Sequence, residues 1–201
     1  MLITTFAELA GRIAAADRHG LVRLVAVDGP GGAGKSTFAG RLAVALDDAP
    51  VIPIDDFLSW EDLTGWWPRF EQQVVEPLLA GRPAVYQQRD WEHDYWGDAL
   101  GPWRTVPPAP MVVVEGVTAS RRALAGRLAC AVWVDTTPEV RLGRGLRRDG
   151  ARIHAAWLDF MRREEAFFAA DGTRERADVL VDAAPTLPHD PEREFVQLRV
   201  G

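Results

Sequence analysis

The amino-acid sequence predicts an α/β fold, a three-layer sandwich in which helices cover both faces of a parallel sheet of about five strands. The first observation behind this prediction is that short apolar runs alternate with segments of helical spacing along the chain. The second is that the runs 21–27 and 111–115 are apolar at nearly every position, which is typical of strands buried on both faces. At 201 residues, the chain has the length of one such domain.

The elements follow from local signals. A helix is expected over 5–19, because its apolar residues recur at helical spacing and Thr5 with Glu8 can form a capping box. The strand 21–27 then ends at Asp28. The other expected elements are helices over 35–46, 69–80, 119–128, 138–148 and 153–169, strands over 51–54, 111–115, 131–135 and 177–181, a loop over 81–110, and an edge strand at 195–200.

Composition limits the function classes. The net charge of −6 argues against a general nucleic-acid-binding surface, and the single cysteine, Cys130, excludes an internal disulfide. No apolar stretch is long enough to cross a bilayer, and the N-terminus lacks the basic-then-apolar layout of a secretion signal. We therefore expect a cytoplasmic enzyme that acts without nucleic acid or membrane partners. The sequence leaves homo-oligomerisation open.

The clearest functional signal is the octet 29–36, Gly-Pro-Gly-Gly-Ala-Gly-Lys-Ser, which fits the phosphate-binding loop pattern G-x-x-x-x-G-K-S/T at every fixed position. Its lysine, Lys35, is the only lysine in a chain with 22 arginines. A compact ammonium fits between nucleotide phosphates, whereas a planar guanidinium is too wide and too directional. The glycines let backbone N–H groups turn toward the phosphates, and the helix that follows adds its positive end. The residues expected to hold the nucleotide are Gly29, Gly31, Gly32, Ala33, Gly34, Lys35, Ser36 and Thr37.

Acidic residues follow several predicted strands, at the sheet edge where open parallel sheets bind ligands. Glu115 closes an apolar run and precedes Gly116, an arrangement that favours an acid serving Mg²⁺ together with the hydroxyl of Ser36. Asp55 follows another short strand, where a carboxylate could accept the proton of an attacking hydroxyl. An Asp-Asp turn without a catalytic part is the alternative for that position.

Arginines recur at three- and four-residue steps beyond residue 140, so that Arg144 and Arg148 share one helix face. Such a face could close over a transferred phosphoryl group, with a short arginine-bearing lid at about 148–153 and Gly150 as its hinge. Arg152 is a weaker candidate for an arginine that closes over the phosphoryl group. An arginine-rich solvated helix is the competing explanation.

Six of the eight tryptophans fall between Trp60 and Trp103, in sequence interrupted by proline and glycine. We expect this segment, about 57–105, to be an insertion on the substrate side of a single domain, 1–201. Its rings could wall a pocket for a planar or sugar-like molecule. They could equally form a satellite core under a long loop, and the sequence leaves both interpretations open.

With these residues placed, the chain resembles the uridine kinase-like group of P-loop kinases over about residues 21–183. The phosphate loop matches strongly, and the segment 114–117, Val-Glu-Gly-Val, is similar to the family strand whose glutamate serves Mg²⁺. The resemblance implies that Asp55, within Ile-Asp-Asp-Phe at 54–57, is the catalytic base and contacts the substrate. The segment 89–91, Arg-Asp-Trp, resembles a Tyr-Asp-Phe stretch that lines the nucleoside pocket. The substrate-binding residues implied are Asp55, Phe57, Arg89, Asp90 and Trp91.

Two departures limit what this resemblance implies. The lid after Asp149 is a few residues shorter than in uridine kinases, and Trp-rich sequence replaces the loop that binds the substrate. The fold and the ATP chemistry are therefore expected to transfer to this chain. The nucleoside substrate is not.

We expect a kinase that moves the γ-phosphoryl group of Mg-ATP to a hydroxyl of a nucleoside-like or other small-molecule substrate. Its expected catalytic residues are Lys35, Asp55, Arg144 and Arg148, and its cofactors are ATP and Mg²⁺ held by Ser36 and Glu115. A P-loop ATPase or nucleotide-dependent switch without a small-molecule acceptor is the alternative. A guanine-reading Asn-Lys-x-Asp motif is ruled out because Lys35 is the only lysine.

Overall fold

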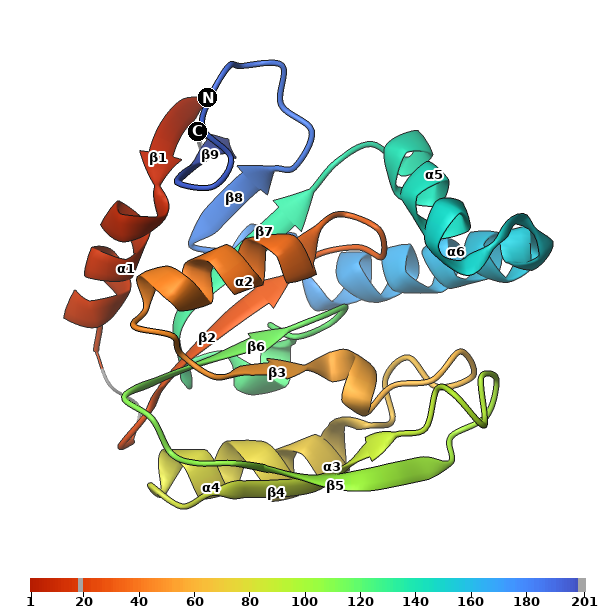
Figure 1. The fold of residues 1–201 in the computed structure, drawn as a ribbon, viewed down its shortest axis with the longest axis horizontal. Helices are drawn as coiled ribbons and strands as arrows, with labels where there is room; N and C mark the ends of the chain where they lie inside the picture. The colour runs from red at the N-terminus through yellow and green to blue at the C-terminus, as the bar shows by residue number, and fades with distance from the viewer. Residues whose placement is uncertain (18–19, 199–201) are drawn as a thin grey trace.

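The computed structural model describes residues 1–17 and 20–198, and its centre is a seven-stranded sheet with the order β1-β9-β8-β7-β2-β6-β3 (Figure 1). The five strands from β8 to β3 run parallel, as the sequence predicts, and β9 and β1 add two antiparallel strands at one edge. The strands of this sheet are β1 Leu2–Thr5, β2 Arg23–Asp28, β3 Val51–Pro53, β6 Met111–Glu115, β7 Leu128–Asp135, β8 Val179–Asp182 and β9 Glu194–Leu198.

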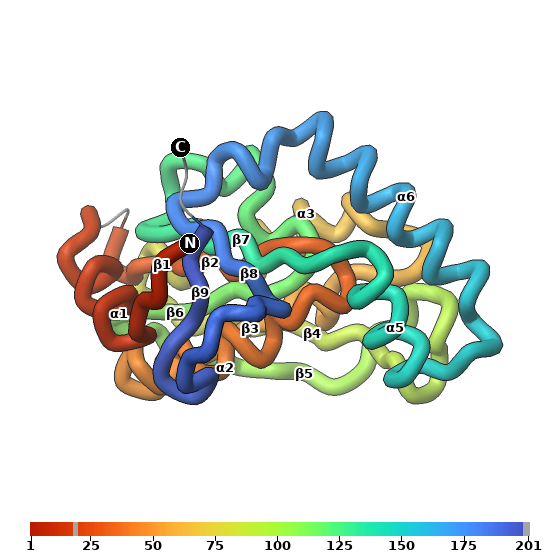
Figure 2. Tube along the Cα trace, turned by 90° about the horizontal axis from the view of Figure 1, so that it is seen from above, coloured from red at the N-terminus to blue at the C-terminus, as the bar shows by residue number. Residues whose placement is uncertain are grey.

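Helices cover both faces of the sheet, and Figure 2 shows α2 and α6 on opposite sides of it. Alternate residues of β2 show the division, because Val25 and Val27 join the core cluster under α1 and α2, whereas Leu24 and Ala26 join the cluster on the other face. The helices are α1 Phe6–Ala15, α2 Lys35–Ala45, α3 Trp67–Phe70, α4 Glu76–Leu79, α5 Pro138–Asp149 and α6 His154–Asp171, with a π-helical stretch, Glu71–Val75, joining α3 to α4. The predicted three-layer sandwich is confirmed.

The two ends of the chain form the extra edge of the sheet. β9 pairs with β8 on one side and with β1 on the other, so the expected edge strand near the C-terminus is an inner strand. Its predicted residues 199–200, like residues 18–19 of the first helix, lie outside the described residues. Thr5 caps α1 through the predicted capping box with Glu8, and α1 ends at Ala15 rather than at residue 19.

The expected loop over 81–110 is wrong, because this segment contains an antiparallel hairpin of β4 Ala84–Arg89 and β5 Leu100–Val106. In β4 the side chains of Ala84 and Tyr86 are buried and Val85 is exposed, which is the alternation of a strand with one covered face. β5 is mostly exposed and contains glycine and proline, so its strand character comes from pairing with β4 rather than from its own pattern.

The expected helix over 119–128 is also wrong. The backbone N–H groups of Thr118 and Ser120 donate to the carboxylate of Asp28, at 2.9 and 2.7 Å, instead of entering a helical ladder. A single 3₁₀ turn, Arg122–Leu124, follows, and β7 already begins at Leu128. Asp28 is fully buried by these contacts, and burial raises the pKa of its carboxyl group.

The predicted helices near the lid are confirmed as α5 and α6, joined by Gly150 at a φ of 93° and a 3₁₀ turn, Ala151–Ile153. The segment expected to form the lid, at about 148–153, comprises the end of α5 and this short turn. Within the part of the chain that the structure describes, no helix is both long and apolar enough to span a membrane.

Candidate functional site

The phosphate loop connects β2 to α2 and lies at the carboxyl end of the parallel strands. Its glycines adopt backbone conformations that other residues rarely take, with a φ of 75° at Gly32 and 109° at Gly34. A Cβ atom at Gly29 would lie 2.1 Å from the carbonyl oxygen of Val134, so this position needs glycine for close approach to β7. These three positions of the octet therefore need glycine for the backbone conformation or the close packing that the structure shows.

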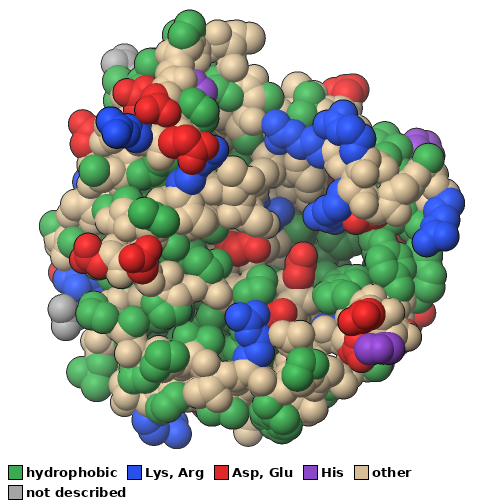
Figure 3. Space-filling model, in the orientation of Figure 1, with side chains coloured by type: hydrophobic (Ala, Val, Ile, Leu, Met, Phe, Trp, Pro, Cys, Tyr) green, Lys and Arg blue, Asp and Glu red, His purple; other side chains and the backbone are tan. Residues whose placement is uncertain are grey.

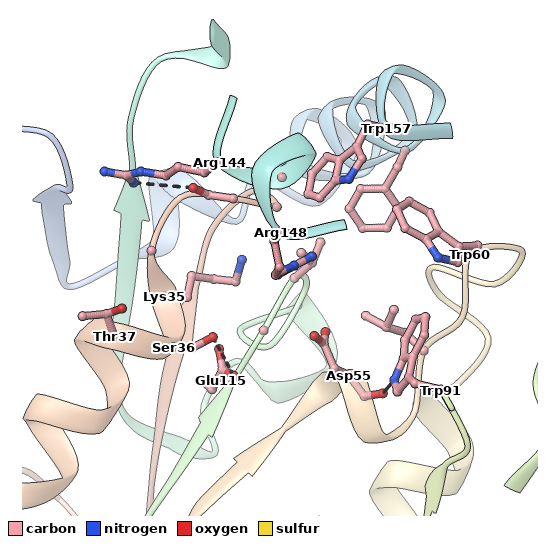
Figure 4. Close-up of a pocket in the computed structure, with 18 residues that line it drawn as sticks. Lys35, Ser36, Thr37, Asp55, Trp60, Trp91, Glu115, Arg144, Arg148 and Trp157 are labelled. Atoms are coloured by element: carbon pink, nitrogen blue, oxygen red, sulfur yellow. Dashed lines mark hydrogen bonds between the residues drawn. The ribbon is translucent and has the colours of Figure 1, made fainter. Parts of the chain in front are cut away.

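Lys35 begins α2 and is 7% exposed, with its ammonium donating to the carbonyl oxygen of Pro30 at 2.9 Å. This contact curls the side chain back along the loop toward the cavity, as Figure 4 shows. An ammonium in this place can move to a phosphate oxygen without leaving the loop, because its three donors rotate about a flexible stem.

Ser36 and Glu115 meet at the end of β6. The Ser36 hydroxyl donates to Oε1 of Glu115 at 3.2 Å, and burial raises the pKa of the Glu115 carboxyl group, which the nearby Lys35 ammonium opposes. Within residues 1–17 and 20–198 no cluster of three acidic, histidine or cysteine side chains could hold a metal alone. One carboxylate and one hydroxyl oxygen fit Mg²⁺, which takes its other ligands from phosphates and water.

The structure separates the two neighbouring acids that follow β3 in the turn Ile54–Asp56. Asp55 is exposed to the cavity, and its backbone carbonyl accepts a hydrogen bond from Nε1 of Trp91 at 2.8 Å. Asp56 turns away, accepting from the hydroxyl of Tyr86 at 2.9 Å and pairing with Arg104 at 3.2 Å. Asp55 is therefore the acid that can meet a ligand, and Asp56 holds the hairpin.

Two of the predicted arginines reach the site from α5. Arg144 donates to the backbone carbonyls of Ala33 at 2.9 Å and Ala183 at 3.0 Å, which fixes it beside the phosphate loop. Arg148 forms a two-pronged ion pair with Asp149, and this carboxylate raises the pKa of the arginine. Arg152 is exposed and does not line the cavity.

These groups surround one cavity of about 280 Å³, and Figure 3 shows it as a hollow with basic side chains above and acidic ones below. Lys35, Asp55 and Arg148 point into the same space in Figure 4. A second cavity of about 440 Å³ adjoins it past Gly34, Thr37 and Arg144, and runs beneath the segment between β8 and β9. The lining of the first cavity consists of Gly31, Gly32, Gly34, Lys35, Ser36, Thr37, Asp55, Leu58, Trp60, Trp91, Glu115, Gly116, Val117, Arg144, Gly145, Arg148, Trp157 and Phe160.

Comparison with known proteins gives relatives by structure. No protein-family model and no curated protein matches the sequence significantly. A possible uridine kinase from Bacillus stearothermophilus superposes with a TM-score of 0.65 at 20% identity, over 87% of this chain and 96% of that one. A candidate fructose transport system kinase from Silicibacter sp. TM1040 superposes with a TM-score of 0.62 at 22% identity, over 82% and 95%. The chain has the P-loop kinase fold.

Within this P-loop kinase fold, the tryptophan cluster divides between a pocket wall and a core. Trp60 and Trp91 line the cavity, whereas Trp66 and Trp67 pack in the core cluster beneath β3 and β6. The last two of the cluster are exposed, Trp96 at 48% and Trp103 at 62%. Both interpretations of the cluster thus hold, each for different rings.

The sequence analysis missed Trp157 of α6, which joins Trp60 in the wall with a ring-centroid distance of 6.0 Å. Its indole N–H donates to Asp149 at 3.0 Å. Its ring packs so closely on Gly145 of α5 that a Cβ atom at this glycine would lie only 2.5 Å from the ring. A lone tryptophan in a helix carries no signal of this kind in the sequence, because the partner glycine lies on another helix.

Three residues implied by the family resemblance lie away from the cavity lining. Phe57 packs in the core against Phe70 and Tyr86. The Arg89 guanidinium, 3% exposed, stacks on the ring of Trp91 at 3.7 Å and thereby supports this wall from behind. Asp90 accepts from the backbone and ring nitrogens of His93.

A further acid, Glu164 of α6, lies buried behind the phosphate loop and was also missed. Burial raises the pKa of its carboxyl group to about 7, although the backbone N–H of Gly31 and the charges of Lys35 and Arg141 oppose this shift. The signal that could have found it is weak, since a glutamate in a polar helix usually faces water.

Glu164 should make the stability of the protein depend on pH. Because its pKa in the folded state is above the usual 4.5, the folded protein holds the proton more tightly than the unfolded chain. Its contribution to the free energy of unfolding is therefore full below pH 4.5 and falls by roughly 3 kcal/mol as the pH rises to about 7. Urea unfolding of wild type and Glu164→Gln from pH 4.5 to 8 measures this. As the pH rises, the free energy of unfolding of Glu164→Gln should increase relative to that of wild type. A difference between the two free energies that is constant with pH would contradict the prediction.

Proposed function

We propose that this protein is an ATP-dependent kinase that transfers the γ-phosphoryl group of Mg-ATP to a hydroxyl group of a small molecule. The observation that carries the proposal is that Lys35, the Ser36–Glu115 pair and Asp55 face one cavity from the ends of three neighbouring strands. A nucleotide switch also needs Lys35 and the Ser36–Glu115 pair. A carboxylate beside an aromatic pocket, as at Asp55, is needed only where a small molecule accepts the phosphoryl group.

The phosphate loop supplies the electrostatic part of the reaction. The loop amides and the Lys35 ammonium bind the β- and γ-phosphates and stabilise the negative charge that gathers on the transferred group. Ser36 and Glu115 would hold Mg²⁺, which when bound neutralises phosphate charge. Arg148 points into the same space from α5 and adds a guanidinium, which is held by its two-pronged ion pair with Asp149.

Asp55 acts on the acceptor. Its carboxylate orients the attacking hydroxyl and accepts its proton as the oxygen bonds to phosphorus. Trp60, Trp91 and Trp157 form the apolar wall against which the body of the acceptor packs, and they exclude water that would otherwise hydrolyse ATP. These rings suit a nucleoside-like molecule, a sugar or another small alcohol with an exposed apolar face.

The adjoining second cavity offers a place for the nucleoside part of ATP. Thr37, which directly follows Ser36 of the loop, and Arg144 line its entrance. A chain of phosphates bound on the loop therefore leads into this cavity. Its walls include the apolar Phe38, Val181 and Pro185. We propose this as the base-binding site.

Acceptor-dependent ADP formation tests the function. Purified protein with Mg-ATP should form ADP slowly alone and many-fold faster with one of a panel of pyrimidine nucleosides, sugars, vitamin precursors and hydroxylated antibiotics. Mass spectrometry should then find the acceptor heavier by one phosphoryl group. Slow hydrolysis that no acceptor accelerates would favour the switch or accessory ATPase instead.

A further inference from the structure

Glu164 of α6 holds the phosphate loop by a direct contact. Its Oε2 accepts a hydrogen bond from the backbone N–H of Gly31 at 2.7 Å, although the two residues are 133 positions apart in the sequence. Its Oε1 accepts from Nη1 of Arg141 in α5, also at 2.7 Å. The side chain is 1% exposed, so no water competes for either bond. A carboxylate with both oxygens engaged in this way is fixed in place.

This contact lies on the side of the loop that faces away from the nucleotide cavity. Gly31 lines that cavity, whereas Glu164 does not. Glu164 lines instead a groove of about 370 Å³ on the far side, together with Pro30 and Arg141. The N–H of Gly31 therefore points away from the phosphates, and the loop presents only its later amides to them.

Helices α5 and α6 also enclose the loop by close packing. A Cβ atom at Gly31 would lie 3.1 Å from the rings of Phe160 and Trp157 in α6, and one at Gly32 would lie 2.5 Å from the carbonyl oxygen of Arg141 in α5. The Gly31 N–H has its hydrogen-bond partner in Glu164, and this bond anchors the first half of the loop against α6. Loss of the acceptor leaves a buried N–H without a partner, which favours any loop conformation that finds another.

We propose that Glu164 is a positioning residue of the phosphate loop, and that with Arg141 behind it this carboxylate holds Gly31 in the conformation in which the later amides and Lys35 receive nucleotide phosphates. The inference rests on the proposed function, because it assigns a triphosphate to the loop. Arg141 and Lys35 place positive charge beside Glu164, and both oppose the rise in the pKa of its carboxyl group that burial causes.

Two substitutions of similar size separate hydrogen bonding from packing. Glu164→Leu keeps the volume and removes the acceptor, and we expect the Kd for Mg-ATP to rise roughly tenfold or more. Glu164→Gln keeps one oxygen that can accept from Gly31 but loses the acceptor for Arg141, so its Kd should rise clearly less than that of Glu164→Leu. Glu165→Ala is the control, because this exposed neighbour lines the same groove but forms no hydrogen bond to the loop among the described residues, so its Kd should not change. Calorimetry measures each Kd after a melting curve shows that the variant is folded.

Amide exchange gives a test that needs no variant. In the nucleotide-free wild-type protein, the Gly31 amide should exchange with solvent far more slowly than an exposed loop amide, because it is hydrogen-bonded and buried. Rapid exchange of Gly31 would overturn the proposal.

The binding results decide in the same way. Wild-type affinity in Glu164→Leu, tighter binding in it, or equal losses in the leucine and glutamine variants would each contradict a positioning role. A protected Gly31 amide in a protein that takes up no Mg-ATP would overturn the proposed function and this role together, while leaving the contact itself demonstrated.

Discussion

Replacing Asp55 by asparagine should lower the turnover number by roughly 10²- to 10⁴-fold and leave the affinity for Mg-ATP nearly unchanged. Asparagine has almost the same shape, but its amide cannot accept the proton of an attacking hydroxyl. The phosphate loop lies elsewhere in the cavity and keeps all its donors, so nucleotide binding has no reason to weaken. Steady-state kinetics with a saturating acceptor, and calorimetry with Mg-ATP, measure the two quantities separately.

The neighbouring acid provides the matched control. Asp56→Asn changes the same group one residue later, where it faces Tyr86 and Arg104 instead of the cavity. It should lower the melting temperature of the protein and keep most of the turnover number. Wild-type turnover in Asp55→Asn would remove this residue from the mechanism, whereas equal losses in both variants would indicate a structural effect.

Removing the loop lysine should have a comparably large effect, on binding as well as on turnover. We expect Lys35→Ala to lower kcat/KM by roughly 10²- to 10³-fold, because no other ammonium can bridge the β- and γ-phosphates from within the loop. Lys35→Arg should fail to restore activity, since a guanidinium is too broad for the space that the ammonium shares with the Pro30 carbonyl. Kinetics and calorimetry with Mg-ATP test both variants.

The outcome for arginine is informative in itself. If Lys35→Arg kept most of the activity, the site would require only positive charge, and the argument from the shape of the ammonium would be wrong. If Lys35→Ala bound and used Mg-ATP like wild type, the loop would not be a phosphate site at all. A melting curve close to that of wild type shows that either variant is folded.

The parts of the site that sequence patterns predict are the ones encoded within a few neighbouring residues. The octet 29–36 specifies its own backbone, because glycine is needed for the left-handed conformations at Gly32 and Gly34. The strand ending in Glu115 is apolar on both faces and delivers one carboxylate at the sheet edge. Short spacing fixes these features, so the loop conformation, the acid at the strand end and the parallel sheet could all be predicted.

Other parts depend on contacts between distant segments. The choice between Asp55 and Asp56 is made by Tyr86 and Arg104 of the hairpin, which the sequence shows only as a loop-like stretch. The failed helix at 119–128 has the same origin, because Asp28 binds backbone amides about 90 positions away. No local pattern contains such partners.

The sequence by itself therefore determined that this chain has the phosphate-loop motif, an acid at the end of a buried strand and an α/β fold, since each depends on consecutive residues whose backbone and burial preferences agree. Only the tertiary structure decided which tryptophans line the pocket and which aspartate faces it. It also decided that Glu164 accepts a hydrogen bond from Gly31 of the loop. The physical reason is that burial and hydrogen bonding act between groups that meet in space. Gly31 and Glu164 meet because α6 packs beside the loop in the folded chain. No residue near either of them in the sequence predicts this contact.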